Sequence, residues 1–251
     1  MDRPSPPLLA VEGLEQSFGG VMALAGVSFQ VPAGLIYAVI GPNGAGKTTL
    51  FNDLCGFYKP SSGSIRFDGH ELCGLPPHRI AARGMARTFQ NLQLFFNMTV
   101  IENVMGGCHL RARTGLLAAA LRLPPVRREE RQLRLWAREA LELCDLTDRA
   151  DQPAGALPYG LMKRVEIARA LAAKPRLLLL DEPAAGLNDT ETLALRELIA
   201  RIRASGVTVL LVEHHMPLVM GVSDRLLVLD YGGVLAEGAP ADIQADPRVI
   251  A

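Results

Sequence analysis

Residues 41–48, GPNGAGKT, decide the fold of this chain, because they follow an apolar run, LIYAVI at 35–40, and precede a helical pattern. The stretch fits G-x-x-x-x-G-K-[ST], a pattern that needs a strand before it and a helix after it. Gly41, Gly44 and Gly46 let the backbone curl so that successive N–H groups converge on an anion. The N-terminus of the following helix adds its positive end. The segment therefore predicts a loop that binds phosphate.

The side chains of this loop have separate expected roles. Lys47 can reach the outer phosphates of a nucleotide, and the hydroxyl of Thr48 can bind Mg²⁺. The residues of the loop expected to bind the nucleotide are Gly41, Pro42, Asn43, Gly44, Ala45, Gly46, Lys47, Thr48 and Thr49.

A second segment, LLLLDEP at 177–183, is an apolar strand that ends in two carboxylates. Asp181 is expected to hold Mg²⁺, and Glu182 is expected to point toward a hydrolytic water. The alternative for this pair is an acidic turn at the end of a strand. Its position after a phosphate loop in an alternating chain favours the metal and water roles.

The composition of the whole chain restricts the class of protein. At about 150 residues per domain, 251 residues predict one large domain or a domain with a subdomain. Lys+Arg and Asp+Glu both number 26, so no net positive field favours nucleic acid as a partner. No run approaches the roughly 18 to 20 apolar residues that span a bilayer, and MDRPSPP at the start lacks the apolar core of a signal peptide. We expect a cytoplasmic protein that does not bind nucleic acid.

Short apolar runs alternate with helical patterns, which is typical of a parallel sheet covered by helices. The strands expected in this sheet are 35–40, 177–180, 207–212 and 226–229, all without polar alternation and therefore buried on both faces. Shorter strands with polar interruptions, expected at 8–12, 27–31 and 64–68, predict a small antiparallel layer beside it.

Strand signals are missing between about residues 97 and 156. Within 127–144, Leu133, Trp136, Ala140 and other apolar residues recur at helical spacing, which predicts an amphipathic helix. We expect a single α/β domain over residues 8–251 with an inserted helical subdomain at 97–157.

A third segment, LPYGLMKRVEIARAL at 157–171, places a glycine-containing turn before a helix. Together with the phosphate loop, DEPAAGLN at 181–188 and a histidine after the next strand, it resembles the nucleotide-binding subunit of ATP-binding cassette (ABC) transporters. The stretch ARTFQNLQLF at 86–95 is most similar to the branched-chain amino-acid importer branch of that family. The resemblance covers almost the whole chain. It implies a P-loop NTPase (RecA-like) core that binds ATP and Mg²⁺.

The resemblance also implies roles for residues outside the loop. Phe18 would stack on adenine, although a phenylalanine of the core or of a hairpin is the alternative. Gln90 would touch the Mg²⁺ and water region and link it to a membrane partner, and His214 would contact the γ-phosphate. Tyr159 and Gly160 would cap the phosphates bound by an opposite subunit. The implied catalytic residues are Lys47, Gln90, Glu182 and His214, and the implied metal ligands are Thr48, Gln90 and Asp181.

The segment at 157–171 departs from the usual LSGGQ signature at two positions. Pro158 replaces the serine, so neither a hydroxyl nor a backbone N–H is available there. Leu161 replaces the glutamine. These departures put the strength of the contact between two subunits in doubt more than the family resemblance itself.

The resemblance implies that two ATP-binding subunits, identical or related, hold ATP between them and drive integral membrane permease subunits. The expected function is ATP hydrolysis coupled to import of branched-chain or related amino acids, by a subunit on the inner face of the cell membrane. The nearest alternative is the ATPase of a lipid or lipopolysaccharide exporter. A soluble ABC protein that is not coupled to transport is the other alternative.

The segment NLQLFFNMTV at 91–100 follows Gln90 and is a candidate docking site for the permease. Phe95 and Phe96, if exposed, would form an apolar groove for a helix of the membrane subunit. The alternative is that they belong to the core of the helical subdomain.

Overall fold

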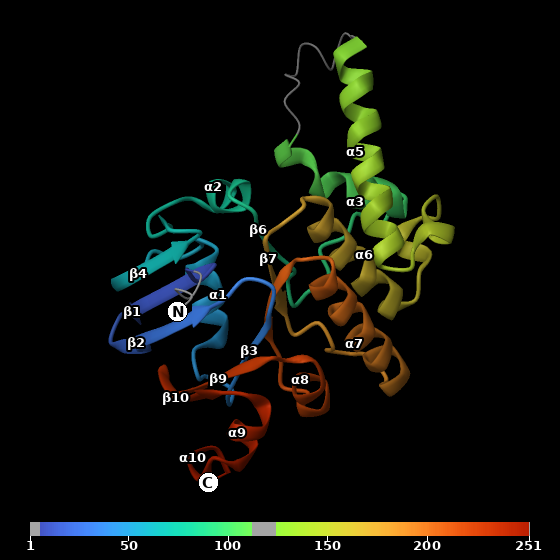
Figure 1. The fold of residues 1–251 in the computed structure, drawn as a ribbon. Coiled ribbons are helices and arrows are strands. Elements are labelled where there is room, and N and C mark those ends of the chain that lie inside the picture. The colour runs from blue at the N-terminus through green and yellow to red at the C-terminus, as the bar shows by residue number, and fades with distance from the viewer. Residues whose placement is uncertain (1–5, 112–123, 251) are drawn as a thin grey trace, which may run out of the picture.

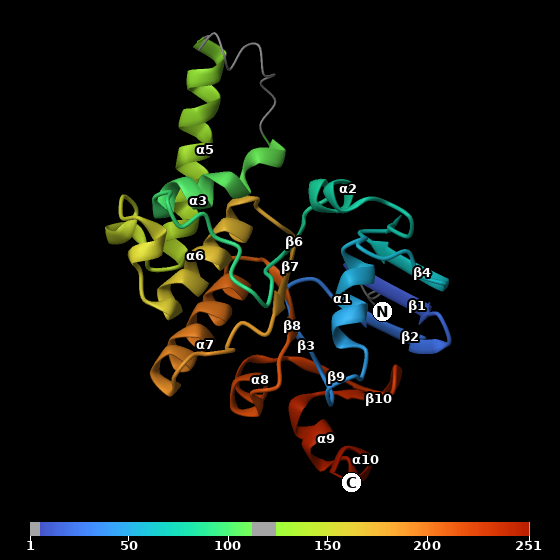
Figure 2. The ribbon, with the colours of Figure 1, turned by 180° about the vertical axis from the view of Figure 1, so that it is seen from behind.

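Two β-sheets lie side by side in the computed structural model, which describes residues 6–111 and 124–250 (Figures 1 and 2). The first sheet is antiparallel and has the strand order β2-β1-β4-β5. Its strands are β1 (Leu9–Phe18), β2 (Val21–Val31), β4 (Ser62–Phe67) and β5 (His70–Glu71).

The second sheet has the strand order β10-β9-β3-β8-β7-β6, and only β10 runs antiparallel to its neighbour. Its strands are β3 (Ile36–Ile40), β6 (Met85–Arg87), β7 (Leu177–Asp181), β8 (Thr208–Val212), β9 (Arg225–Asp230) and β10 (Gly233–Gly238). Every residue of β3, β7 and β8 is buried, as expected for strands covered on both faces.

Alternate residues of the central strands face two different hydrophobic clusters. In β7, Leu178 and Leu180 belong to a cluster under the helices α3, α5, α6, α7 and α8, whereas Leu177 and Leu179 face the antiparallel sheet and α1. This is the period of two that strand geometry imposes. The nucleotide loop and its helix therefore lie on one face of the central sheet, and most other helices lie on the opposite face.

The helices are α1 (Lys47–Leu54), α2 (Pro77–Ala82), α3 (Val100–Gly107), α5 (Pro124–Leu143), α6 (Tyr159–Ala172), α7 (Asp189–Ala204), α8 (Met216–Val222), α9 (Pro240–Ala245) and α10 (Pro247–Ile250). Short 3-10 turns lie at His109–Arg111, Thr147–Arg149 and Ala154–Ala156. The expected amphipathic helix is part of α5, which packs on α3 and α6. Among the described helices, none is long and apolar enough to cross a membrane.

The expected α/β fold class, with an antiparallel layer beside the main sheet, is confirmed. The expected bounds of two strands in that layer were too short, because β1 and β2 continue past their polar residues with shifts in pairing register. Polar side chains on the outer face interrupt the apolar pattern without ending the strand. The edge strands β6 and β10 were not predicted.

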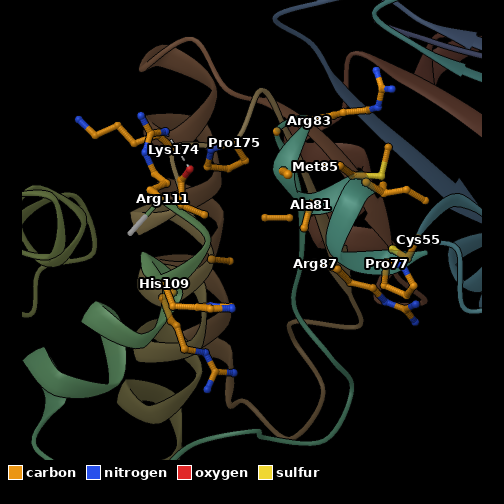
Figure 3. A pocket seen from close by; sticks show the side chains of 18 of the residues that line it. Cys55, Pro77, Ala81, Arg83, Met85, Arg87, His109, Arg111, Lys174 and Pro175 are labelled. Atoms are coloured by element: carbon orange, nitrogen blue, oxygen red, sulfur yellow. Dashed lines mark hydrogen bonds between the residues drawn. The ribbon is translucent and has the colours of Figure 1, made fainter. Parts of the chain in front are cut away.

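A groove of about 610 Å³ lies between α2 and β6 on one side and the ends of α3 and α6 on the other (Figure 3). Its aromatic lining residues are Phe57, Phe89 and Phe95. Its basic lining residues are Arg83, Arg87, His109, Arg111, Arg169, Lys174 and Arg176, and Glu166 is the single acidic residue among the described residues that line it. The groove therefore has an apolar part, and its charged residues are mainly basic.

Candidate functional site

The phosphate loop between β3 and α1 depends on glycine at two positions. Gly41 has φ 150°, and a Cβ there would lie 2.1 Å from the carbonyl oxygen of Leu229. Gly46 has φ 102°, and its Cβ would lie 2.6 Å from the carbonyl oxygen of Ala23. The loop is thus pressed against two strands in a conformation that a side chain would prevent.

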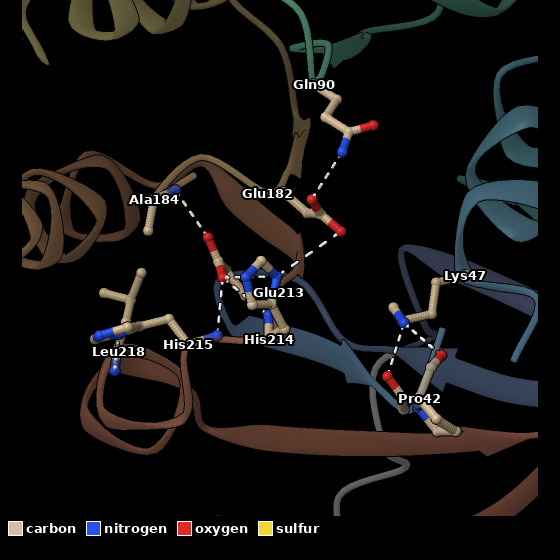
Figure 4. Close-up of polar contacts among 10 residues, drawn as sticks. Pro42, Lys47, Gln90, Glu182, Ala184, Glu213, His214, His215 and Leu218 are labelled. Carbon is tan, nitrogen blue, oxygen red and sulfur yellow. Dashed lines mark hydrogen bonds and ion pairs between the residues drawn. The ribbon is translucent and has the colours of Figure 1, made fainter. Parts of the chain in front are cut away.

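Lys47 begins α1, and its side chain folds back into the loop. Its Nζ donates to the carbonyl oxygens of Gly41 at 2.7 Å and Pro42 at 2.8 Å (Figure 4). Burial lowers the pKa of Lys47, and the nearby carboxylates of Glu182 and Asp181 oppose this effect. The positive charge is therefore held inside the loop, facing two carboxylates.

Glu182 lies next to two other predicted site residues. Its Oε2 accepts a hydrogen bond from Gln90 Nε2 at 3.0 Å, and its Oε1 lies 3.8 Å from His214 Nδ1 (Figure 4). The residue has φ 47°, a backbone conformation that is uncommon for a non-glycine residue. The structure thus brings together three residues that follow β6, β7 and β8 in the chain.

Glu213, which the sequence analysis did not select, fixes the loop of His214. Its buried carboxylate accepts N–H groups from Ala184 at 2.7 Å, His214 at 2.9 Å and His215 at 3.0 Å. It follows the apolar strand β8 just as Asp181 ends β7, and that position could have identified it. His215 is the N-cap residue of α8, and its Nδ1 accepts the N–H of Leu218 at 3.3 Å.

Asp181 is buried and paired with a residue that the sequence analysis also missed. Its Oδ2 accepts a hydrogen bond from Arg87 Nη2 at 2.7 Å, and its backbone N–H donates to Thr88 Oγ1 at 3.4 Å. The oxygens of Asp181, Thr48 and Gln90 are of the type that Mg²⁺ prefers. Thr48 and Gln90 are exposed, so water can complete the coordination, and this set of donors fits a magnesium ion.

Phe18 lies at the end of β1 with 45% of its surface exposed, which excludes the core alternative. Its ring meets that of Tyr58 edge to face, with the centroids 5.1 Å apart. Tyr58 follows α1 and was not predicted. The two rings form an exposed aromatic pair at the hairpin between β1 and β2.

The turn at Pro158 lies away from the phosphate loop within one chain. Helix α6 contributes to the hydrophobic cluster on one face of the central sheet, and α1 contributes to the cluster on the other (Figures 1 and 2). Tyr159 is exposed, and a Cβ on Gly186 would lie 3.0 Å from its ring. The structure therefore does not bring Tyr159 and Gly160 to the other predicted nucleotide-binding residues of the same chain.

Helix α6 is instead tied to the segment that carries Gln90. Lys163 Nζ donates to the carbonyl oxygen of Gln90 at 3.1 Å, and Glu166 accepts the N–H of Phe89 at 3.2 Å. Arg169 donates to the carbonyl oxygen of Gln93. Burial raises the pKa of Glu166. A displacement of α6 would therefore displace Gln90.

The apolar side chains of the segment after Gln90 lie partly in the core and partly at the surface. Leu92 and Leu94 pack into the cluster under the helices. Phe95 and Phe96 are 59% and 51% exposed, and Phe95 lines the groove. The alternative that both phenylalanines belong to the core is therefore wrong.

Comparison with known proteins agrees with this geometry. Residues 24–185 match the family described as ABC transporter, and residues 234–251 match the one described as branched-chain amino acid ATP-binding cassette transporter. The chain is 49% identical to the high-affinity branched-chain amino acid transport ATP-binding protein BraF of Pseudomonas aeruginosa, over 98% of this chain and 97% of BraF. It is 47% identical to LivG of Escherichia coli K12, which has the same description and the same coverage.

A solved structure has the same fold over nearly the whole length. It is the ADP conformation of MJ1267, an ATP-binding cassette of an ABC transporter, and it superposes with a TM-score of 0.85. The two chains are 33% identical, and 98% of each is covered.

Proposed function

Since the chain belongs to the ABC transporter family and is a nucleotide-binding ATPase subunit of it, we propose that it powers the import of branched-chain amino acids. The observation that carries this proposal is the similarity to BraF over 98% of the chain. The alternative, an exporter ATPase, is less well supported, since the two relatives compared above are described as branched-chain amino acid transport proteins.

The phosphates of ATP would bind to the backbone N–H groups of the loop and to Lys47. Lys47 Nζ, which donates to two loop carbonyls in the structure, would then donate to phosphate oxygens instead. Thr48, Asp181 and Gln90 would hold Mg²⁺, which neutralises phosphate charge when it is bound. Phe18, with Tyr58 beside it, would offer an aromatic surface to adenine.

Glu182 would orient and polarise the attacking water. Gln90 holds one oxygen of its carboxylate, which fixes the direction of the other. His214 lies on the side of Glu182 away from Gln90 and would contact the γ-phosphate. Glu213 keeps His214 in place through the backbone N–H of that residue.

The active unit would be a pair of ATP-binding subunits. Tyr159 and Gly160 lie away from the phosphate loop of their own chain, so a second chain is needed for them to contact a nucleotide. We assign residues 8–251 to a single ABC ATPase domain and residues 97–157 to a helical subdomain within it. That subdomain would carry the turn at Pro158 toward the opposite chain.

The groove would receive the integral membrane permease on the inner face of the cell membrane. Its aromatic side chains suit a helix with an apolar face. Its excess of basic residues suits a partner segment that carries carboxylates. Phe89 and Phe95 of the groove flank Gln90, so a bound helix would lie next to the segment that contacts Glu182.

The test is transport by the assembled complex. The subunit would be purified with its integral membrane partners, reconstituted into vesicles, and supplied with ATP. We expect ATP-driven uptake of labelled leucine, isoleucine and valine, and none by the same complex with Glu182→Gln. Uptake of only unrelated solutes would refute the proposal that branched-chain amino acids are the transported substrates. ATP-driven release of lipid would support the alternative function as an exporter ATPase.

A further inference from the structure

Arg87 joins two segments of the nucleotide site that are distant in sequence. It ends β6, where it lies opposite Leu179 in the parallel pairing with β7. Asp181 follows two residues after Leu179, and side chains two positions apart on a strand point to the same face. The sheet register therefore places the guanidinium of Arg87 on the same side as the carboxylate of Asp181.

The guanidinium bridges β7 and the helix of the phosphate loop. Its Nη2 donates to Asp181 Oδ2 at 2.7 Å, and its Nη1 donates to Asn52 Oδ1 of α1 at 2.7 Å. The side chains of Arg87 and Asp181 are each 7% exposed. A buried ion pair of this kind fixes both partners, because loss of either would leave an uncompensated charge.

The pair uses only one oxygen of Asp181. Within the described parts of the chain, Oδ1 receives no hydrogen bond, whereas Oδ2 is held by Arg87. One oxygen is therefore free for a cation or for a water bound to it. The other is held by a group that fixes the rotation of the carboxylate.

Three aromatic rings surround the guanidinium. Its central carbon lies 5.5 Å from the ring centroid of Phe51, 5.9 Å from that of Phe57 and 5.2 Å from that of Phe89. These distances are within the range of cation–π attraction. Phe57 and Phe89 also line the groove, so Arg87 lies between the groove and Asp181.

We propose that Arg87 is a positioning residue that holds Asp181 in the orientation needed to bind Mg²⁺. The inference rests on the metal role proposed for Asp181. The Nη1 and Nη2 atoms of Arg87 are engaged by Asn52 and Asp181, so we expect Arg87 to act through Asp181, on the magnesium-dependent part of nucleotide affinity. Residues that orient a metal ligand typically change metal affinity by about 10- to 100-fold when they are replaced.

The test compares Arg87→Met with its parent in a Glu182→Gln background. Equilibrium binding of a fluorescent ATP analogue is measured in EDTA and then at increasing free Mg²⁺. We expect the affinity in EDTA to stay within about twofold, while the Mg²⁺ concentration at half-maximal enhancement rises about tenfold or more. Arg203→Met removes another Arg–Asp ion pair, with Asp224, outside the site and should change neither value.

One further variant makes the result decisive. Asp181→Asn should abolish the enhancement by Mg²⁺. If Asp181→Asn does so and Arg87→Met leaves the Mg²⁺ response unchanged, the positioning role is wrong. If neither variant alters the response, the metal role of Asp181 is wrong as well.

Thermal unfolding of each variant checks that the protein is folded. Should Arg87→Met fail to fold, Arg87→Lys replaces it, because lysine keeps the charge but lacks the fork that reaches both acceptors. A smaller rise in the required Mg²⁺ concentration is expected for Arg87→Lys. An equal loss of affinity with and without Mg²⁺ would indicate a purely structural role and overturn the proposal.

Discussion

Gln90 donates a hydrogen bond from Nε2 to the Oε2 of Glu182 over 3.0 Å. The backbone carbonyl of the same glutamine accepts a hydrogen bond from Lys163 of α6. Its neighbour Phe89 lines the groove. A single residue thus contacts the carboxylate proposed to polarise water, while its backbone is attached to the helix that follows Pro158.

Replacing Glu182 by Gln should remove most steady-state ATP hydrolysis and leave ATP binding largely intact. The change deletes the carboxylate proposed to polarise water but keeps Lys47 and Asp181, which are proposed to bind the phosphates and the metal. Turnover and equilibrium nucleotide binding are measured on one preparation. Unchanged turnover would show that Glu182 is not the group that activates water.

Lys47→Ala should weaken binding of ATP itself. A hydrogen bond to a charged group is commonly worth about 1.5 to 3 kcal/mol, which is roughly ten- to a hundredfold in affinity. Calorimetry with ATP gives the affinity, and Lys59→Ala, at an exposed position after α1, is the control. Equal affinities of Lys47→Ala and the parent would contradict the assignment.

Local sequence was sufficient to select the residues whose proposed role depends on one turn. The glycines of the loop, Lys47, Asp181 and Glu182 were selected because each lies at a strand end that the apolar pattern reveals. Arg87 could not be found in the same way. Glu213 follows an apolar strand, as Asp181 ends one, but its contact with Ala184, like the contact of Arg87 with Asp181, is revealed only by the strand order β6-β7-β8.

The strand bounds illustrate a second limit of sequence patterns. The continuous apolar runs of β3, β7 and β8 were predicted nearly to the residue, because both faces of these strands are buried. The edge strand β6 has only three residues, and β10 is rich in glycine, so neither has a pattern that distinguishes a strand from a loop. They form strands because their backbones pair with the adjacent strands β7 and β9.

Replacing Phe95 and Phe96 together by Ser should disrupt assembly with the membrane partner while ATP binding is kept. Both rings are exposed, so their loss should have little effect on the stability of the isolated subunit. Co-purification with the permease, nucleotide binding and the thermal transition are measured together. A collapsed thermal transition would show that the rings stabilise the fold, against their exposure.

Pro158→Ser should strengthen ATP-dependent pairing of two chains in a Glu182→Gln background. Pro158 precedes α6 and provides no side-chain cap, whereas serine would add a hydroxyl donor for a phosphate of the opposite chain. Such a contact is worth about 1.5 to 3 kcal/mol at each of two sites. The dimer fraction is measured by analytical ultracentrifugation.

One outcome of the ultracentrifugation experiment would contradict the prediction for Pro158→Ser. A parent that is already a tight ATP-bound dimer at low concentration, unchanged by Pro158→Ser, would show that the hydroxyl is not needed. The N–H groups of Tyr159 and Gly160 at the start of α6 would then be sufficient for the phosphate contact. Otherwise turnover should depend on the permease, which keeps two copies close together.

Asp53 should make the folded protein less stable as pH rises toward neutrality. It is 2% exposed, neither carboxylate oxygen has a hydrogen-bond partner within the described residues, and burial raises its pKa to about 7. The folded state therefore binds a proton that the unfolded state releases near pH 4. The stabilisation is complete below about pH 4 and is lost as pH rises to about 7.

Asp53→Asn should remove this loss of stability. From pH 5 to pH 8, the free energy of unfolding of the variant should gain roughly 2 to 3 kcal/mol relative to the parent. Urea unfolding at both pH values gives the two differences. Equal differences at pH 5 and pH 8 would show that Asp53 is ionised in the folded protein at both.

The three hydrogen bonds of Glu213 have a consequence for hydrogen exchange with solvent. One buried carboxylate holds the amide hydrogens of Ala184, His214 and His215, which belong to two different loops. These three amide hydrogens are protected from exchange while the hydrogen bonds to the carboxylate are intact. Movement of the carboxylate breaks all three bonds together. In a deuterium-exchange experiment these amides should therefore open as one cooperative unit, although the two loops are separated by α7 and β8 in the chain.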